Sequence, residues 1–280
     1  MIQKLIMYLS LYPTVRYAFI AILLISVCAA FLGVSLVLKR YSMIGDGLSH
    51  VSFGATAIAT VLGLITPIYI TLPVTVLAAI LLLGIGKTTH RRGDSAIAMI
   101  SSAALAFGYL ILNLFGDDAN TSNDACATLF GSGIIGIGID DVILCTSLSA
   151  FVLLIFILFY NKIFALTFDE EFATATGTRA RVYNMLIAVI TAITVVLAMN
   201  MLGALLASAL IIFPALSAMR LFKTFKKVTL CAVIISVICA TVGTFISIAF
   251  ATAIGPTVVA ADLTVFAICS AIGAIKTKRK

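Results

Sequence analysis

The sequence has no tryptophan, few charged side chains and no long polar segment. Only 10% of its 280 residues are Asp, Glu, Lys or Arg, whereas 62% are hydrophobic and the mean hydropathy is +1.23. About a quarter of the residues in soluble domains are charged. This composition therefore excludes a soluble globular protein and indicates an integral membrane protein. No stretch of fifty residues lacks a long apolar run, so we expect one transmembrane domain over residues 1–280.

Several catalytic and metal-binding signatures are also missing. The cysteines contain no CxxC pair and no Cys/His cluster, which argues against a disulfide framework or a thiolate metal site. The segment Gly84–Thr88 (GIGKT) resembles the end of a phosphate-binding loop but lacks the earlier glycine, since position 81 is Leu81. We therefore expect no enzyme in this chain, and a separate chain must hydrolyse ATP if ATP is used. The six cysteines are Cys28, Cys126, Cys145, Cys231, Cys239 and Cys269.

What the chain does have is a series of apolar runs. Their lengths predict an all-α polytopic membrane protein with about eight or nine transmembrane helices, one of which could be re-entrant. A short amphipathic lead-in, residues 1–16, precedes the first run. The nine candidates are Tyr17–Leu38, Met43–Ile65, Ile70–Ile85, Ser95–Asn113, Val142–Tyr160, Val182–Met199, Gly203–Met219, Val228–Phe250 and Thr257–Ile275.

Positive charge is distributed unevenly between these runs. No Lys or Arg occurs between Arg92 and Lys162, where the loop 114–141 carries several Asp residues. The positive-inside rule places that loop on the extracellular side and places the segment 161–181 and the C-terminus in the cytoplasm. The same rule explains the net charge of +7, so we expect no nucleic-acid partner. We expect a multi-pass protein in contact with membrane lipid.

The stretch Tyr41–Gly63 places Asp46 and His50 four residues apart at the start of an apolar run. On a helix both side chains then project from one face. Ionisable groups inside a membrane are costly and often functional, although side chains near the end of a span can also extend to the interface. One Asp and one His suit divalent ions such as Zn²⁺ or Mn²⁺. Two ligands are too few for a closed site, but a two-fold dimer would supply four.

Three other segments carry weaker signals. Phe168–Gly177 (FDEEFATATG) has acids at its start and glycine at its end, as in a short capped helix, which would be either an ordinary connector or a docking helix. In Gly203–Met219, small residues such as Gly203 and Ala207 favour close packing, and Pro214 should kink the helix. Asp262 lies in the last run, either at the interface or near a pathway.

Four blocks in this order resemble the metal-ion permeases of bacterial ATP-binding-cassette transporters, with zinc-uptake permeases the most similar. The resemblance covers essentially the whole chain. The blocks are MIGDGLSH (Met43–His50), FDEEFATATG (Phe168–Gly177), LGALLASALIIFPALSAMR (Leu202–Arg220) and GPTVV (Gly255–Val259).

The resemblance implies a homodimeric permease in the bacterial cytoplasmic membrane. It would dock on cytoplasmic ATP-binding subunits, receive the ion from an extracellular metal-binding protein, and hold no permanent cofactor. Asp46 and His50 would contact the transported ion, with zinc expected and manganese or iron as alternatives. The second block implies an ATPase-coupling role for Phe168, Asp169, Glu170, Glu171, Ala173 and Gly177.

Two other functions use the same residues. An ion-coupled secondary transporter or channel would also place Asp and His in the membrane, but it would need no docking segment. An intramembrane aspartyl protease would pair Asp46 with Asp262, but its GxGD motif is absent because Met43 stands two residues before Gly45.

Overall fold

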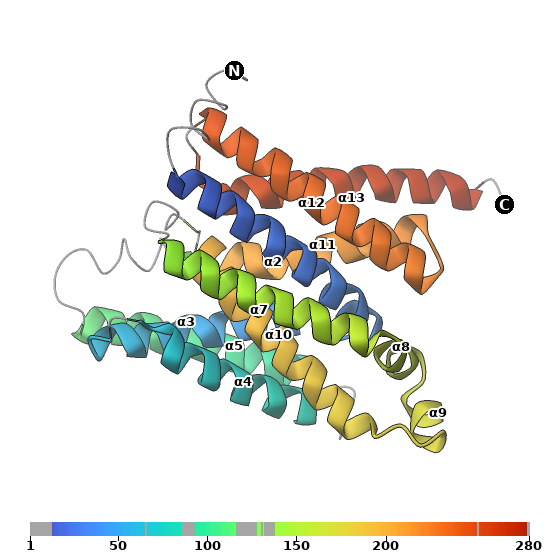
Figure 1. Ribbon diagram of the computed structural model, residues 1–280, viewed down its shortest axis with the longest axis horizontal. Helices are drawn as coiled ribbons and strands as arrows, with labels where there is room; N and C mark the ends of the chain where they lie inside the picture. The colour runs from blue at the N-terminus through green and yellow to red at the C-terminus, as the bar shows by residue number, and fades with distance from the viewer. Residues whose placement is uncertain are drawn as a thin grey trace.

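The protein is a bundle of long helices (Figure 1), seen here in a computed structural model. The structure describes residues 13–64, 66–85, 93–115, 128–129, 131, 138–250 and 252–278. No strand occurs in these residues. The helices are α2 (Pro13–Leu38), α3 (Ile44–Val61), α4 (Ile68–Ile85), α5 (Gly93–Phe115), α7 (Ile139–Leu158), α8 (Tyr160–Phe168), α9 (Glu170–Ala175), α10 (Ala180–Leu202), α11 (Ala204–Leu221), α12 (Phe225–Phe250) and α13 (Ile254–Lys278).

Each of the nine apolar runs forms a helix, with ends within a few residues of those predicted. A helix satisfies all its interior backbone hydrogen bonds within the segment, which is why apolar runs of this length fold this way in lipid. Seven of the described helices are long and apolar enough to cross a membrane, and the apolar part of α4, Ile68–Leu83, is shorter. Among the nine, α3 is not in either group, because its Gly, Ser, Thr, Asp and His residues make it more polar than the others.

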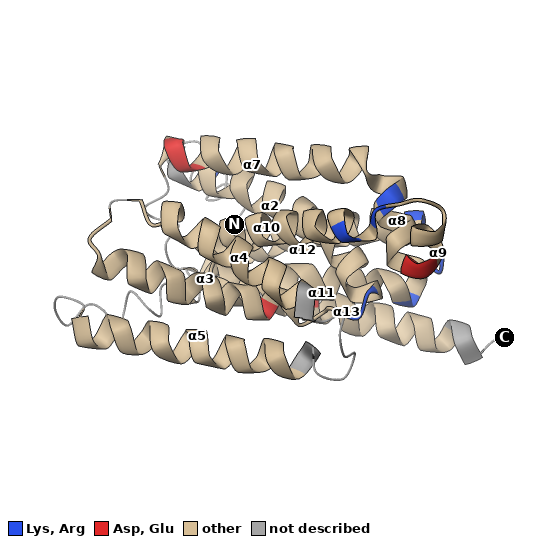
Figure 2. Cartoon of the chain, turned by 90° about the horizontal axis from the view of Figure 1, so that it is seen from below, with Lys and Arg blue, Asp and Glu red and all other residues tan. Residues whose placement is uncertain are grey.

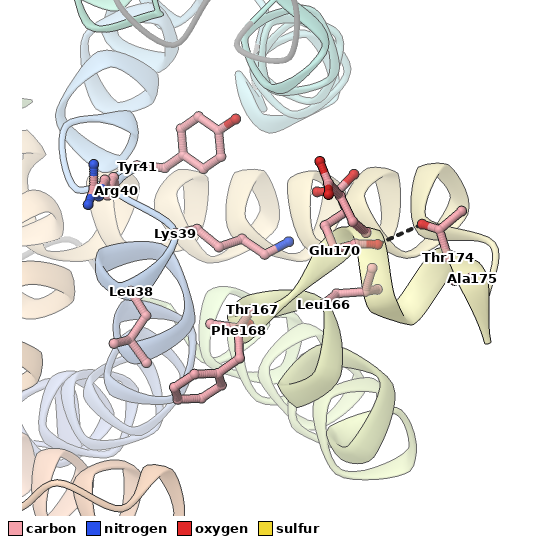
Figure 3. Close-up of a pocket in the computed structure, with 11 residues that line it drawn as sticks. Leu38, Lys39, Arg40, Tyr41, Leu166, Thr167, Phe168, Glu170, Thr174 and Ala175 are labelled. Atoms are coloured by element: carbon pink, nitrogen blue, oxygen red, sulfur yellow. Dashed lines mark hydrogen bonds between the residues drawn. The ribbon is translucent and has the colours of Figure 1, made fainter. Parts of the chain in front are cut away.

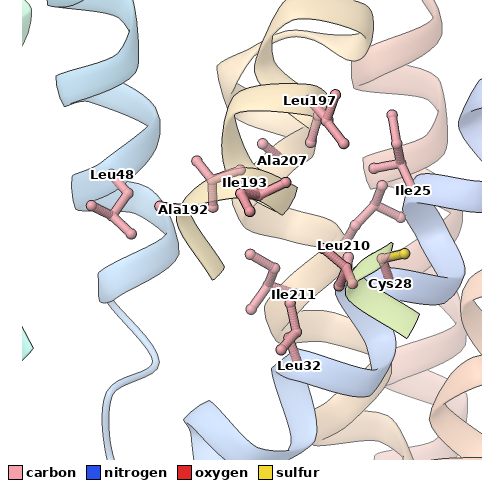
Figure 4. Packing of buried hydrophobic residues seen from close by; sticks show 14 of the residues in the cluster. Ile25, Cys28, Leu32, Leu48, Ala192, Ile193, Leu197, Ala207, Leu210 and Ile211 are labelled. Atoms are coloured by element: carbon pink, nitrogen blue, oxygen red, sulfur yellow. The ribbon is translucent and has the colours of Figure 1, made fainter. Parts of the chain in front are cut away.

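The core lies where α2, α10 and α11 meet. Figure 4 shows side chains of these three helices in contact, including Ile25 of α2, Ile193 of α10 and Leu210 of α11. Leu48 brings α3 to the edge of the same cluster. The outer helices α5, α7, α12 and α13 leave most of their apolar surface exposed, as expected for surfaces that face lipid or another subunit.

Close helix contacts depend on small residues such as glycine. A Cβ added at Gly47 would lie 2.7 Å from Ile97 Cγ2 of α5, and one at Gly54 would lie 2.9 Å from the Ala104 carbonyl oxygen. Gly203 has another use. It precedes α11 with φ +92°, in the turn after α10, so it is a turn residue and not a packing position within the helix.

Most of the described Lys and Arg side chains lie at one end of the bundle, together with the acids of α9, and two Asp residues lie at the other end. Figure 2 shows Lys and Arg gathered at the end that holds α8 and α9, while Asp140 and Asp141 begin α7 at the opposite end. This separation agrees with the charge pattern of the sequence. Most of the loop 114–141 and the residues GKT and His90 lie outside the described residues.

Candidate functional site

The first turns of α3 bring Asp46 and His50 together. His50 Nε2 lies 3.6 Å from Asp46 Oδ1. This distance is too long for a hydrogen bond between the two side chains. It is close to the roughly 3.4 Å that separates two ligands on a tetrahedral metal ion with bonds of about 2.1 Å. The pair predicted from the i, i+4 spacing is therefore set at a distance that suits a shared ion.

The surroundings of His50 leave one ring edge available to an ion. Nδ1 is buried and has no hydrogen-bond partner among the described residues. Nε2 is the ring nitrogen that faces Asp46. The Ser49 hydroxyl donates 2.8 Å to the Asp46 backbone carbonyl and leaves the carboxylate free of that contact. Gly45 keeps this turn close to α11, since a Cβ there would lie 3.0 Å from Ile211 Cδ1. The pair is thus held on a tightly packed part of α3.

The site is incomplete within one chain. No group of three or more His, Cys, Asp or Glu side chains that could hold a metal occurs in the described part of the chain. The side chains of His50 and Asp46 are 22% and 38% exposed, so the pair opens to the surface of the bundle. An ion held by this pair would need further ligands from outside these two side chains.

The segment Phe168–Gly177 folds as its sequence predicts. Asp169 caps α9, and its carboxylate accepts a 2.8 Å hydrogen bond from the Phe172 amide. Gly177 follows the helix with φ +86°, a conformation that favours glycine. Phe168 and Phe172 are exposed, whereas Ala173 is buried and packs with Leu166 and Ala180. The segment 161–181 is therefore not an extended loop: it contains α8 and α9.

Aromatic side chains fix α8, and through it α9, to the bundle. Phe164 and Phe168 of α8 pack on Phe225 of α12, with ring centroids 5.1 and 5.9 Å apart. Tyr160 adds a third ring at 5.6 Å from Phe225. This cluster holds Phe168, the first residue of the segment Phe168–Gly177, against the first turn of α12.

A cavity of about 870 Å³ separates α9 from the linker between α2 and α3 (Figure 3). Lys39, Arg40 and Tyr41 line one side of it, and Glu170 and Glu171 of α9 line the other. Lys39 Nζ donates 2.6 Å to Asn184 Oδ1, and Asn184 Nδ2 donates 3.0 Å to Glu170 Oε1. Sequence reasoning missed Lys39 and Asn184. The available signal was an amide side chain in the second turn of the apolar helix α10.

Asp262 is not part of the α3 site. Its side chain is buried between α13 and α12, where it faces the Cys239 thiol, and neither carboxylate oxygen has a hydrogen-bond partner among the described residues. This burial places Asp262 in the contact between α12 and α13, and its position at the interface or near a pathway stays a prediction. Its nearest titratable neighbour is Cys239, not Asp46, so the geometry gives no support to a pair of protease carboxylates.

The remaining predicted residues have structural positions. Ala207 is fully buried in α11 at the core, and Pro214 lies inside the same helix. The kink at Pro214 stays a prediction. The described cysteines are free, and all except Cys231, which is half-buried, are buried, in keeping with apolar roles.

Comparison with known proteins gives one family over nearly the whole chain. The model of the ABC 3 transport family matches residues 11–273. The manganese transport system membrane protein MntC of Halalkalibacterium halodurans is 27% identical over 258 residues, which cover 92% of this chain and 86% of that protein. The zinc uptake system membrane protein ZnuB of Buchnera aphidicola is also 27% identical over 258 residues, covering 92% of this chain and 97% of that protein.

A solved structure has the same architecture. PsaBC from Streptococcus pneumoniae, determined in complex with a Fab, superimposes with a TM-score of 0.84 at 27% sequence identity. The match covers 96% of this chain and 95% of that one.

Proposed function

The chain belongs to the ABC 3 transport family, and from this membership we propose that it is the permease subunit of an ATP-driven bacterial importer of a divalent transition metal ion. The relatives named for manganese and zinc transport support a metal cargo. The observation that carries the proposal is the Asp46–His50 pair, which presents a carboxylate oxygen and an imidazole nitrogen at a spacing that fits one ion.

A second copy of the chain would complete the ion site. A two-fold axis beside α3 would bring two Asp46–His50 pairs together and supply four ligands, the usual number for Zn²⁺. The partial exposure of both side chains supports this arrangement, because a site opening to the protomer surface can be covered by a partner. Separation of the two pairs would then lower the number of ligands and release the ion.

Zinc is the expected cargo, with manganese and iron as competitors. Imidazole nitrogen suits zinc and other first-row metals, whereas carboxylate oxygen also suits manganese. A site with two of each type would discriminate weakly by chemistry alone. The relatives agree with this, since one is named for manganese and another for zinc.

ATP hydrolysis would come from a separate cytoplasmic subunit that docks on α9. The exposed Phe168 and Phe172 rings and the exposed Glu171 form a small projecting surface suited to such a partner, whereas the Glu170 carboxylate faces Asn184. At the opposite end, an extracellular metal-binding protein would deliver the ion. The permease would thus alternate between an outward-open and an inward-open state around Asp46 and His50.

Metal uptake tests this proposal directly. Cells lacking their own zinc and manganese importers would receive this chain together with its ATPase and binding protein. We expect uptake to fall at least about tenfold for Asp46→Ala and for His50→Ala, because each removes half of one chain's ligands, a loss of about 1.4 kcal/mol or more in ion binding.

The control is Asp140→Ala, which removes an exposed carboxylate at the start of α7. Membrane levels of all variants would be checked by immunoblotting. Unchanged uptake in both site variants would contradict the ion site. Uptake that persists without the ATPase would contradict the ATP-driven importer and favour a secondary transporter.

A further inference from the structure

Three polar side chains from separate parts of the chain form a continuous hydrogen-bonded bridge beside α9. Lys39 follows α2, Asn184 lies in α10, and Glu170 is the first residue of α9. The two bonds measure 2.6 Å from Lys39 Nζ to Asn184 Oδ1 and 3.0 Å from Asn184 Nδ2 to Glu170 Oε1. Asn184 is 6% exposed, so its amide is the buried centre of the bridge.

The chemistry of the three groups fixes the direction of the bridge. A lysine ammonium only donates hydrogen bonds, and an ionised carboxylate only accepts them. The amide of Asn184 has one accepting and one donating end, so it can satisfy both neighbours in a single orientation. Loss of either neighbour leaves a buried amide group without its partner, which is unfavourable.

The bridge reaches the start of the helix that carries the ion pair. Lys39 begins the linker between α2 and α3, and Arg40 next to it has φ +62°. The Tyr41 amide donates back to the Leu36 carbonyl at 2.9 Å, which closes a tight turn. Only this short, closed turn separates Lys39 from the first turn of α3, where Asp46 lies.

The cavity between α9 and the linker gives these two elements room to move relative to each other. Figure 3 shows Lys39 extending across this space toward Glu170. Asn184 stands on α10, a mostly buried helix of the core, and its amide is bonded to both elements.

We propose that Asn184 is a positioning residue that couples α9 to the α2–α3 linker, so that movement of α9 changes the position of Asp46 and His50. The proposal rests on the proposed function, because it takes α9 as the docking site of the ATPase. It assigns to the Lys39–Asn184–Glu170 bridge the transmission of that movement to the ion site.

The test measures coupling in the complete complex. Permease, ATPase and binding protein would be reconstituted in lipid vesicles, and uptake of Zn²⁺ and of Mn²⁺ would be measured together with ATP hydrolysis. For Asn184→Leu, which is similar in size and removes both hydrogen bonds, we expect metal uptake per ATP hydrolysed to fall about tenfold. ATP hydrolysis and copurification of the ATPase should stay within about twofold of wild type.

Charge reversal provides a sharper test, because the amide can rotate. Lys39→Glu and Glu170→Lys should each reduce uptake per ATP about tenfold, since one end of Asn184 then faces the wrong kind of group. The double variant should recover to within about threefold of wild type: rotation of the Asn184 amide by 180° again gives each neighbour a partner. The matched control is Lys226→Glu, an exposed charge reversal on α12 outside the bridge.

The outcomes separate this inference from the proposed function. If wild type takes up no metal, or takes it up without the ATPase, the proposed function fails. Uptake by Asp46→Ala equal to that of wild type would overturn the ion site alone. If wild type takes up metal and Asn184→Leu keeps the wild-type ratio of uptake to hydrolysis, the bridge does not transmit movement. If Asn184→Leu loses ATPase copurification, or the charge-reversed pair recovers no coupling, Asn184 has a purely structural role and the inference is overturned.

Discussion

Single residues without hydrogen-bond partners show where this molecule departs from ordinary packing. His50 Nδ1 and both Asp262 carboxylate oxygens are buried and have no partner among the described residues. Buried polar groups are nearly always paired, so each exception needs an explanation. His50 lies beside Asp46 in an arrangement that suits an ion, whereas Asp262 faces a single thiol. An ion at Nε2, the nitrogen that faces Asp46, would leave Nδ1 of His50 unpaired, so the ion site does not explain that atom. We interpret the unpaired Asp262 carboxyl as a local loss of stability.

This interpretation predicts that Asp262→Ala stabilises the protein. Removal of an unpaired buried carboxyl should outweigh the small cavity that it leaves, for a gain of about 1 kcal/mol. The matched control is Asp141→Ala, because the Asp141 carboxylate accepts a 3.0 Å hydrogen bond from the Gly138 amide at the start of α7. That variant should lose about 1 kcal/mol.

Thermal unfolding of the two detergent-purified variants would measure these effects. A melting temperature that falls for Asp262→Ala would mean that the carboxyl has a stabilising partner and would contradict the interpretation. Metal uptake of Asp262→Ala should stay close to wild type, because Asp262 is not part of the α3 site.

At the residue scale, the sequence predicted local pairs well and distant ones poorly. The proximity of Asp46 and His50 follows from helix geometry, since residues four apart share a face. The cap by Asp169 is local in the same way. The bridge through Asn184 joins residues 145 and 14 positions apart, and no local rule brings such residues together.

At the scale of helices, the length and composition of the apolar runs were sufficient to locate nine of them. The short helix α8 was missed because it follows α7 after one residue and continues the same apolar run. Gly203 does pack closely, but it does so in the turn before α11 and not within the helix. Its position before α11 depends on the turn after α10 and on its contact with Gly131, neither of which the spacing of small residues reveals.

Helix contacts through glycine predict a specific steric effect at Gly33. A Cβ added there would fall on the Ile211 carbonyl oxygen of α11, a backbone atom that cannot move as a side chain does. Gly33→Ala should therefore force α2 and α11 apart and destabilise the protein by about 1–3 kcal/mol. Gly138→Ala is the control, because its Cβ would meet only Asp141 Oδ2 at 3.6 Å, and φ there is −85°.

Size-exclusion chromatography of the solubilised variants after graded heating would compare them. Gly33→Ala should lose its monodisperse peak at a lower temperature than wild type, and Gly138→Ala should not. Equal behaviour of the two variants would show that the α2–α11 contact adapts to a methyl group at little cost.

At the scale of the whole molecule, the division of charge sets the orientation that the proposed transport direction requires. Most of the described basic side chains lie at the end of the bundle with α8 and α9 (Figure 2). The first turn of α2, which carries Arg16, and the acidic start of α7 lie at the other end (Figure 1). Loops rich in Lys and Arg remain in the cytoplasm. This predicts that α9 can reach a cytoplasmic ATPase and that the start of α7 faces outside.

Cysteine labelling on intact cells would test the orientation. Asp140→Cys at the start of α7 and Thr174→Cys on α9 both replace exposed side chains at opposite ends of the bundle. In a background with Cys126→Ser, a membrane-impermeant thiol reagent should modify Asp140→Cys at least about tenfold faster than Thr174→Cys, because the bilayer separates the reagent from the cytoplasmic end. After the cells are opened, both should react. The reverse pattern would place α9 outside, where no ATP-hydrolysing subunit could dock, and would contradict both the orientation and the ATP-driven import that depends on it.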